Sequence, residues 1–149
     1  PGVGKGRGSV TGFGFSGFRR GPGSGGVGVQ VGARQGGQGG LHVPEGAFGL
    51  GGVFVEVLKD VSFRLAPFGR DEALAMIREI KGYALLQGAR GTPPCDVDAL
   101  ADALAALSRF AHARRDDFSS VEINPLLALP ACQGALALDA VVMRAGLNR

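Results

Sequence analysis

The sequence predicts a mixed α/β fold, a mixed sheet with flanking helices, over residues 47–149. A Gly-rich segment over residues 1–46 precedes it, and we expect this segment to be disordered. It holds 18 of the 27 glycines of the 149-residue chain and has almost no periodic apolar pattern. Glycine loses the most backbone entropy on folding, and few side chains here offset that loss by burial. From residue 47, strand-like and helix-like apolar patterns alternate, which indicates layers of both.

The charge of the chain divides at the same place. Residues 1–46 carry five Lys or Arg and one acid, whereas residues 47–149 carry eleven Lys or Arg and twelve acids. The formal net charge of +3 therefore belongs to the first segment, and the remainder has the balanced surface typical of a soluble enzyme.

Two further interpretations of the first segment stay open. The stretch "GFGFSGFRRG" (12–21) interleaves Phe with Arg, and stacking plus positive charge can hold single-stranded nucleic acid. Alternatively, a GC-rich gene read in a shifted frame yields Gly- and Arg-rich sequence, which would explain the abrupt start of the folded pattern. Because residue 1 is Pro, we also expect a processed chain or a fragment.

The predicted elements follow the order β-β-α-loop-α-β-β, over residues 51–58, 61–67, 70–82, 83–94, 97–113 and a hairpin over 119–140. Gly82 is a C-cap signal for the first helix, and Asp96 caps the second. The second helix has one apolar stripe. We expect Lys59 and Asp60 to be surface residues.

The hairpin carries three polar residues in an apolar setting. If residues 130–133 form its loop, Asn124 lies opposite Asp139, and directly opposed residues point to the same face. Glu122 shares that face by strand alternation. The other face is expected to carry Val121, Ile123, Leu136, Leu138 and Ala140.

Three hard oxygen donors on one face suit Mg²⁺ better than Zn²⁺, which prefers His and Cys. Mg²⁺ takes one or two protein carboxylates and completes its shell with water and phosphate oxygens. The structural alternative is a cross-strand hydrogen bond between Asn124 and Asp139, with Glu122 solvated.

The two cysteines, Cys95 and Cys132, are far apart in sequence and lack CxxC spacing. We expect two reduced thiols, which is typical of a cytoplasmic protein. No apolar run approaches the length of a membrane-spanning helix, and the Gly-rich start lacks a signal-peptide pattern.

Three motifs carry a resemblance to a known family. "EINPL" followed by "ALDA" resembles the magnesium-binding end of the ATP-grasp domain in succinyl-CoA synthetase β subunits. With "FGLGGVFVEVLKDVSFRLAP" and "MIREIKGYALLQGARGTPP", the chain looks like the C-terminal part of the ATP-grasp domain of NDP-forming acyl-CoA synthetases, the ADP-forming acetate–CoA ligase family. The resemblance covers residues 47–143, so it implies a partial ATP-grasp domain.

The resemblance implies roles for particular residues. Glu122, Asn124 and Asp139 match positions that bind Mg²⁺ with the nucleotide phosphates. The "GLGG" turn and the strand after it match a segment that faces the phosphates, namely Gly49, Gly51, Gly52 and Glu56. Arg90 matches a phosphate- or partner-contacting motif. From the residues alone, a plain tight turn and an exposed loop Arg are equally good interpretations.

The resemblance also implies a reaction, in which acyl-CoA, ADP and phosphate yield carboxylate, ATP and CoA through a phosphohistidine. It implies ATP/ADP and Mg²⁺ as ligands and a CoA-binding, phosphohistidine-bearing domain or α subunit as partner. Neither His42 nor His112 lies in a matching motif, so no catalytic residue is assigned and the chain alone is expected to be inactive. There are two alternatives. The chain is the synthetase-like portion of a protein lysine acetyltransferase, or it is a nucleic-acid-binding protein that uses the basic tail.

Overall fold

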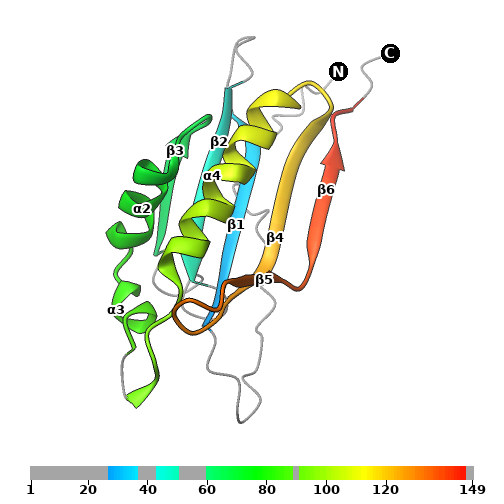
Figure 1. Cartoon of the computed structure of the whole chain (residues 1–149). Coiled ribbons are helices and arrows are strands. Elements are labelled where there is room, and N and C mark those ends of the chain that lie inside the picture. Colours follow the sequence, from blue (N-terminus) through cyan, green and yellow to red (C-terminus); the bar gives the residue numbers. More distant parts are fainter. Residues whose placement is uncertain (1–26, 37–42, 51–59, 89–90, 147–149) are drawn as a thin grey trace, which may run out of the picture.

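The computed structural model describes residues 27–36, 43–50, 60–88 and 91–146. Within these residues the strands form one antiparallel sheet in the order β3-β2-β1-β4-β5, with β6 also paired to β4 (Figure 1). The strands are β1 (Val27–Gly36), β2 (Val43–Leu50), β3 (Val61–Leu65), β4 (Phe118–Ala128), β5 (Ala135–Ala137) and β6 (Ala140–Arg144). The helices are α2 (Arg70–Glu79), α3 (Tyr83–Leu86) and α4 (Val97–Ala113). Helices α2 and α4 lie against the same face of the sheet (Figure 1).

The prediction of disorder is wrong for β1 and for the first half of β2. β1 pairs with β2 on one side and with β4 on the other, so backbone hydrogen bonds on both sides offset the entropy cost of its glycines. The missed signal was the alternation of Val27, Val29 and Val31, a period of two residues that is typical of a strand. The predicted boundary between residues 46 and 47 falls inside β2.

Other predictions concern residues outside the described part of the chain and stay predictions. They are disorder or a shifted reading frame over residues 1–26, disorder over 37–42, the nucleic-acid-binding alternative based on 12–21, the strand over 51–58, and the site residues Gly51, Gly52, Glu56 and Arg90.

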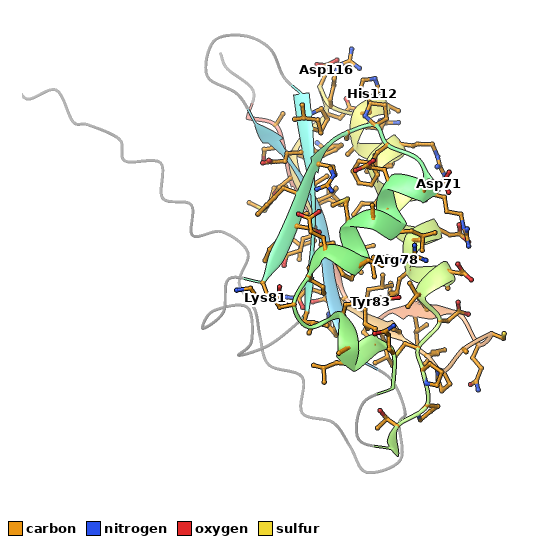
Figure 2. The ribbon with its side chains drawn as sticks, turned by 90° about the vertical axis from the view of Figure 1, so that its left-hand side faces the viewer. Asp71, Arg78, Lys81, Tyr83, His112 and Asp116 are labelled. Carbon is orange, nitrogen blue, oxygen red and sulfur yellow. The ribbon has the colours of Figure 1, made fainter. Side chains whose placement is uncertain are left out.

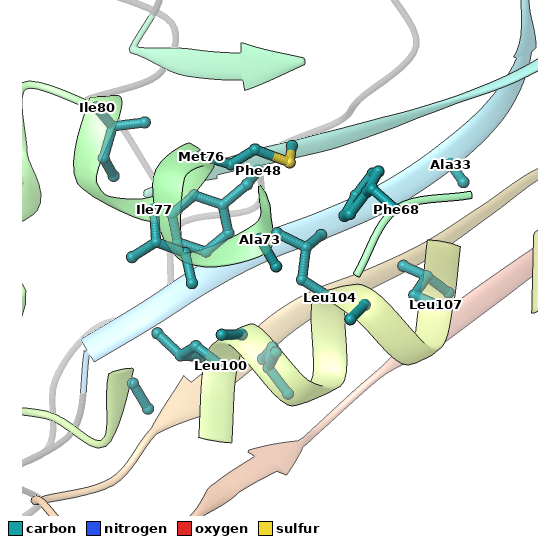
Figure 3. Close-up of a cluster of buried hydrophobic side chains, with 14 of the residues drawn as sticks. Ala33, Phe48, Phe68, Ala73, Met76, Ile77, Ile80, Leu100, Leu104 and Leu107 are labelled. Atoms are coloured by element: carbon teal, nitrogen blue, oxygen red, sulfur yellow. The ribbon is translucent and has the colours of Figure 1, made fainter. Parts of the chain in front are cut away.

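The core lies between the sheet and the helices, and α4 confirms the predicted apolar stripe. Leu100, Leu104 and Ala111 are at most 1% exposed, and they belong to one cluster with Phe48 of β2. Figure 3 shows this cluster, with Met76 of α2 beside Phe48. The helix begins as predicted, because the Asp96 carboxylate accepts the Ala99 N–H at 3.0 Å.

The connection after α2 differs from the prediction. The helix ends at Glu79, and residues 83–86 form the short helix α3 instead of a loop. The expectation of a surface role for Asp60 is wrong, because it is 6% exposed and its two carboxylate oxygens accept the N–H groups of Lys81 and Gly82, each at 2.7 Å. Gly82 is the N-cap of α3 rather than a C-cap, and a Cβ there would lie 2.1 Å from Leu50 Cδ1.

A second buried polar contact joins α4 to the connection before α2. Ser108 is 1% exposed, and its hydroxyl oxygen accepts the Phe68 N–H at 2.7 Å. The described part of the chain contains no helix whose length and apolar character would let it cross a membrane.

Candidate magnesium and nucleotide site

The hairpin between β4 and β5 has the register that the sequence predicted. Leu126 lies opposite Ala137, and the turn falls at residues 130–133. Further along, the Asn124 N–H donates to the carbonyl oxygen of Asp139 at 3.0 Å. The predicted pairing of these two residues is therefore confirmed, through their backbone atoms.

β4 contains a bulge at residues 124–125. Ile123 pairs with Val31 of β1 and Leu126 pairs with Val29, so β4 has one more residue than β1 between the two pairs. An extra residue in one strand bends it and changes which residues share a face. The peptide bond between the two bulge residues, Asn124 and Pro125, is cis.

This bulge overturns one prediction about the hairpin faces. Val121 is 5% exposed and Ile123 packs against the core, but Leu136 and Leu138 are 50% and 45% exposed. Because the bulge shifts the alternation, Leu126, at 3% exposed, joins Val121 in the core. The two leucines of the second limb therefore do not share the buried face.

Glu122 and Asn124 lie close together, and each is half-buried. The Asn124 side-chain Nδ2 donates to Glu122 Oε1 at 3.4 Å. Asp139 is exposed and is held opposite Asn124 by the backbone hydrogen bond. The hairpin thus brings an amide and a carboxylate into contact, with a second carboxylate residue on the facing limb.

Gly49 shares the face of Glu122. Glu122 pairs with Gly32 of β1, which pairs with Ala47 of β2, and Gly49 is two residues further along β2. Directly opposed residues and residues two apart point to the same face. Phe48 points to the helix layer, so this shared face is the one that α2 and α4 leave uncovered. Gly49 lies within β2, so the prediction of a turn at this glycine is wrong.

The donor set fits Mg²⁺ only in part. Carboxylate and amide oxygens are the ligands that Mg²⁺ prefers, and it commonly takes the rest of its shell from water and phosphate. Among the described residues, no group of three or more His, Cys, Asp or Glu side chains is placed to hold a metal ion. Glu122, Asn124 and Asp139 would therefore need phosphate oxygens to complete a site.

The turn of the hairpin is attached to α4 by Asp96, a contact that the sequence did not reveal. Asp96 Oδ1 caps the helix, and Oδ2 accepts the Gly134 N–H at 2.9 Å. The backbone N–H groups of Ala99 and Gly134, followed by that of Cys132, lower the pKa of Asp96, while burial opposes this shift.

Comparison with known proteins agrees with this architecture. The family model for the ATP-grasp domain matches residues 22–143, which is most of the chain. The chain therefore belongs to the ATP-grasp domain family. The match begins before β1, so it includes residues 22–46, which the resemblance noted from the sequence left out.

Curated relatives include ADP-forming CoA ligases. The chain is 47% identical over 97 residues to the β subunit of acetate–CoA ligase (ADP-forming) I from Pyrococcus furiosus, covering 65% of this chain and 40% of that subunit. It is 41% identical over 91 residues to 4-hydroxybutyrate–CoA ligase (ADP-forming) from Nitrosopumilus maritimus, covering 61% of this chain and 13% of that protein. The chain thus spans well under half the length of these relatives.

Solved structures show the same fold. PH1788 from Pyrococcus horikoshii matches with a TM-score of 0.73 and 37% identity, over 80% of this chain and 49% of that chain. An acetyl-coenzyme A synthetase 1 from Ca. Korarchaeum cryptofilum, in complex with coenzyme A and Mg-AMPPCP, matches with a TM-score of 0.71 and 38% identity, over 80% and 54% of the two chains.

Proposed function

We propose that this chain supplies the magnesium-binding end of the nucleotide site in an ADP-forming acyl-CoA synthetase. The whole enzyme would convert acyl-CoA, ADP and phosphate to carboxylate, ATP and CoA through a phosphohistidine. The observation that supports this most directly is the bulged hairpin, where Asn124 lies 3.4 Å from Glu122 and opposite Asp139.

The three residues have distinct parts in this proposal. Glu122 and Asp139 contribute negative charge, and Asn124 contributes a neutral oxygen, which limits repulsion between the ligands. Mg²⁺, when bound, neutralises charge on the phosphoryl group in transfer. The backbone bond between Asn124 and Asp139 keeps the two limbs of the hairpin side by side, which supports a ligand shared by the two residues.

The other proposed contacts come from segments that precede the hairpin in the sequence. We assign contacts with the phosphates to Gly49, Gly51, Gly52 and Glu56, and a phosphate or partner contact to Arg90. Gly49 lies on the face of the sheet that carries Glu122, which supports its place in this set.

The phosphohistidine and the CoA site would come from a partner domain or an α subunit. His112 lies in the last turn of α4 and is not part of the hairpin. The Pyrococcus furiosus relative is named as a β subunit, which supports an α-subunit partner here. We also propose a cytoplasmic location, because Cys95 and Cys132 lack a disulfide framework.

Binding of Mn²⁺ in the presence of ADP, followed by electron paramagnetic resonance of the unbound ion, tests the proposal. Mn²⁺ accepts the same oxygen ligands as Mg²⁺. Asp139→Ala should weaken Mn²⁺ binding by about tenfold or more, since even outer-shell changes cost about 10–100-fold.

Asp116→Ala is the matched control, because Asp116 is an exposed carboxylate in the turn between α4 and β4 (Figure 2). It removes the same charge outside the hairpin. Equal affinities for the two variants would remove Asp139 from the site. If the unaltered chain bound no Mn²⁺ with ADP, the proposed function would be rejected for the chain as it stands.

A further inference from the structure

Asp96 joins the N-terminus of α4 to both ends of the hairpin turn. Its carboxylate accepts the N–H groups of Ala99 and Gly134, at 3.0 and 2.9 Å. Its own N–H donates to the carbonyl oxygen of Leu129 at 2.8 Å, and the Leu129 N–H donates to the Gly134 carbonyl oxygen at 3.1 Å. The two residues that flank the turn therefore both bond to Asp96, Leu129 to its backbone N–H and Gly134 to its side chain.

The limb that this contact holds is short and exposed. β5 has three residues, and Asp139 follows it after a single residue, Leu138. Leu138 N–H donates to the Pro125 carbonyl oxygen at 3.0 Å, and β5 otherwise pairs with the end of β4. The limb lies at the edge of the sheet, where few buried side chains fix its position.

Backbone contacts also attach the hairpin turn to residues 94–95, which directly precede Asp96. The Ala131 N–H donates to the Pro94 carbonyl oxygen at 2.9 Å, and Cys95 forms a bridge with Pro130. These contacts, together with the Cys132 N–H that also faces the Asp96 carboxylate, place the turn beside Asp96, but they do not reach past residue 132. The Gly134 N–H bond is the contact from Asp96 to the limb that leads to Asp139.

We propose that Asp96 is a positioning residue, which holds the second limb of the hairpin so that Asp139 stays opposite Asn124. Its consequence for metal binding rests on the proposed function, whereas its effect on the hairpin does not. The second carboxylate oxygen performs this role, since the first one caps α4.

Asp96→Asn separates these two roles. Asn is as good an N-cap as Asp, because its side-chain oxygen still accepts the Ala99 N–H. Its amide nitrogen donates and cannot accept, so the Gly134 N–H loses its partner. A role limited to helix capping therefore predicts little change in Asp96→Asn, and a positioning role predicts a loosened hairpin.

Amide hydrogen exchange followed by NMR measures the effect. The reporters are the amides of Gly134 and Asn124, the second because it donates to the Asp139 carbonyl oxygen. The Gly82 amide, bound to Asp60, is the reporter outside the hairpin. Ser108→Ala is the matched control, because it removes a buried acceptor on α4 far from the turn.

In Asp96→Asn, the amides of Gly134 and Asn124 should exchange about tenfold faster than in Ser108→Ala. A factor of this size is expected when local opening no longer has to break one hydrogen bond. Denaturant conditions are chosen so that both variants have the same global stability, and exchange at Gly82 should then be equal. Asn124 exchange no faster than in Ser108→Ala would overturn the proposal. If Asp96→Asn fails to fold, Asp96→Ser, which also caps a helix, replaces it.

The same variants with Mn²⁺ and ADP connect the hairpin to the site. Affinity should fall in Asp96→Asn and stay unchanged in Ser108→Ala. Failure of the proposed function would appear as no Mn²⁺ binding by the unaltered chain, and the exchange rates would still decide the role of Asp96. Faster exchange at Asn124 with unchanged affinity would overturn the link to metal binding.

Discussion

The backbone N–H of Asn124 donates to the carbonyl oxygen of Asp139 at 3.0 Å, which aligns a bulge residue of β4 with a residue between β5 and β6. The two residues are 15 positions apart in sequence, on the two limbs of one hairpin. The proposed metal site depends on this alignment, because Glu122 lies beside Asn124 and the second carboxylate comes from the other limb.

We predict that Asn124→Asp lowers the melting temperature of the metal-free protein. A carboxylate at position 124 would lie beside Glu122, where the present contact is 3.4 Å, and two like charges at that distance repel. Thermal unfolding with a chelator should show a fall of about 2–4 °C per kcal/mol of destabilisation, the range for a chain of about 150 residues.

Added Mg²⁺ should then raise the melting temperature of Asn124→Asp more than that of the unaltered protein, because ion binding relieves the repulsion. An equal increase in both proteins would contradict a metal site at this position. Gln87→Glu serves as the control for the change in charge, because it also adds one negative charge and lies at an exposed position outside the hairpin.

Asp60→Asn is expected to destabilise the fold by about 1–3 kcal/mol, because one of two N–H groups beside a buried side chain loses its acceptor. Asp71→Asn, at an exposed position in the first turn of α2, should cost less than about 1 kcal/mol. Urea unfolding gives both free energies. Similar decreases in the two variants would show that Asp60 does not stabilise the turn between α2 and α3.

Gly82→Ala should also destabilise the protein, by about 1–3 kcal/mol, since its Cβ would overlap the Leu50 side chain and force repacking. Gly146→Ala meets no atom within 4 Å and should change the free energy of unfolding by less than about 0.5 kcal/mol. Equal stability of the two variants in urea would mean that Leu50 moves aside at little cost.

Acid should remove the stability that Asp96 contributes. Its pKa is lowered in the folded state, so the folded protein binds this proton more weakly than the unfolded chain does. The contribution is complete above the ordinary Asp pKa of 3.8 and is lost as pH falls through the lower folded value. The difference in unfolding free energy between the protein and Asp96→Asn should therefore be constant near neutral pH and shrink below pH 3.8. A difference that does not change with pH would assign the effect of the substitution to packing.

The parts of the fold that the sequence predicted are those set by local pattern. α4 combines an Asp cap with regular apolar spacing, and the hairpin register follows from the position of its turn. Both depend on residues close in sequence, so no knowledge of distant partners is needed.

The missed parts depend on partners far along the chain. β1 is Gly-rich and is stabilised by pairing with β2 and β4, the latter more than 80 residues away. Asp60 is buried because it meets the amides that follow α2, and α3 forms beside it. The contact of Asp96 with Gly134 spans 38 positions, so a local reading finds only its capping role.

The bulge at residues 124–125 sets which sequence changes the hairpin tolerates. A residue inserted in the turn leaves the paired limbs in frame. Loss of one residue between Ile123 and Leu126 would move each later side chain of β4 to the opposite face of the sheet. Leu126 and Ala128, which are now at most 3% exposed, would then leave the core. We therefore expect length variation among related chains to occur in the turn, and the spacing between Ile123 and Leu126 to stay constant.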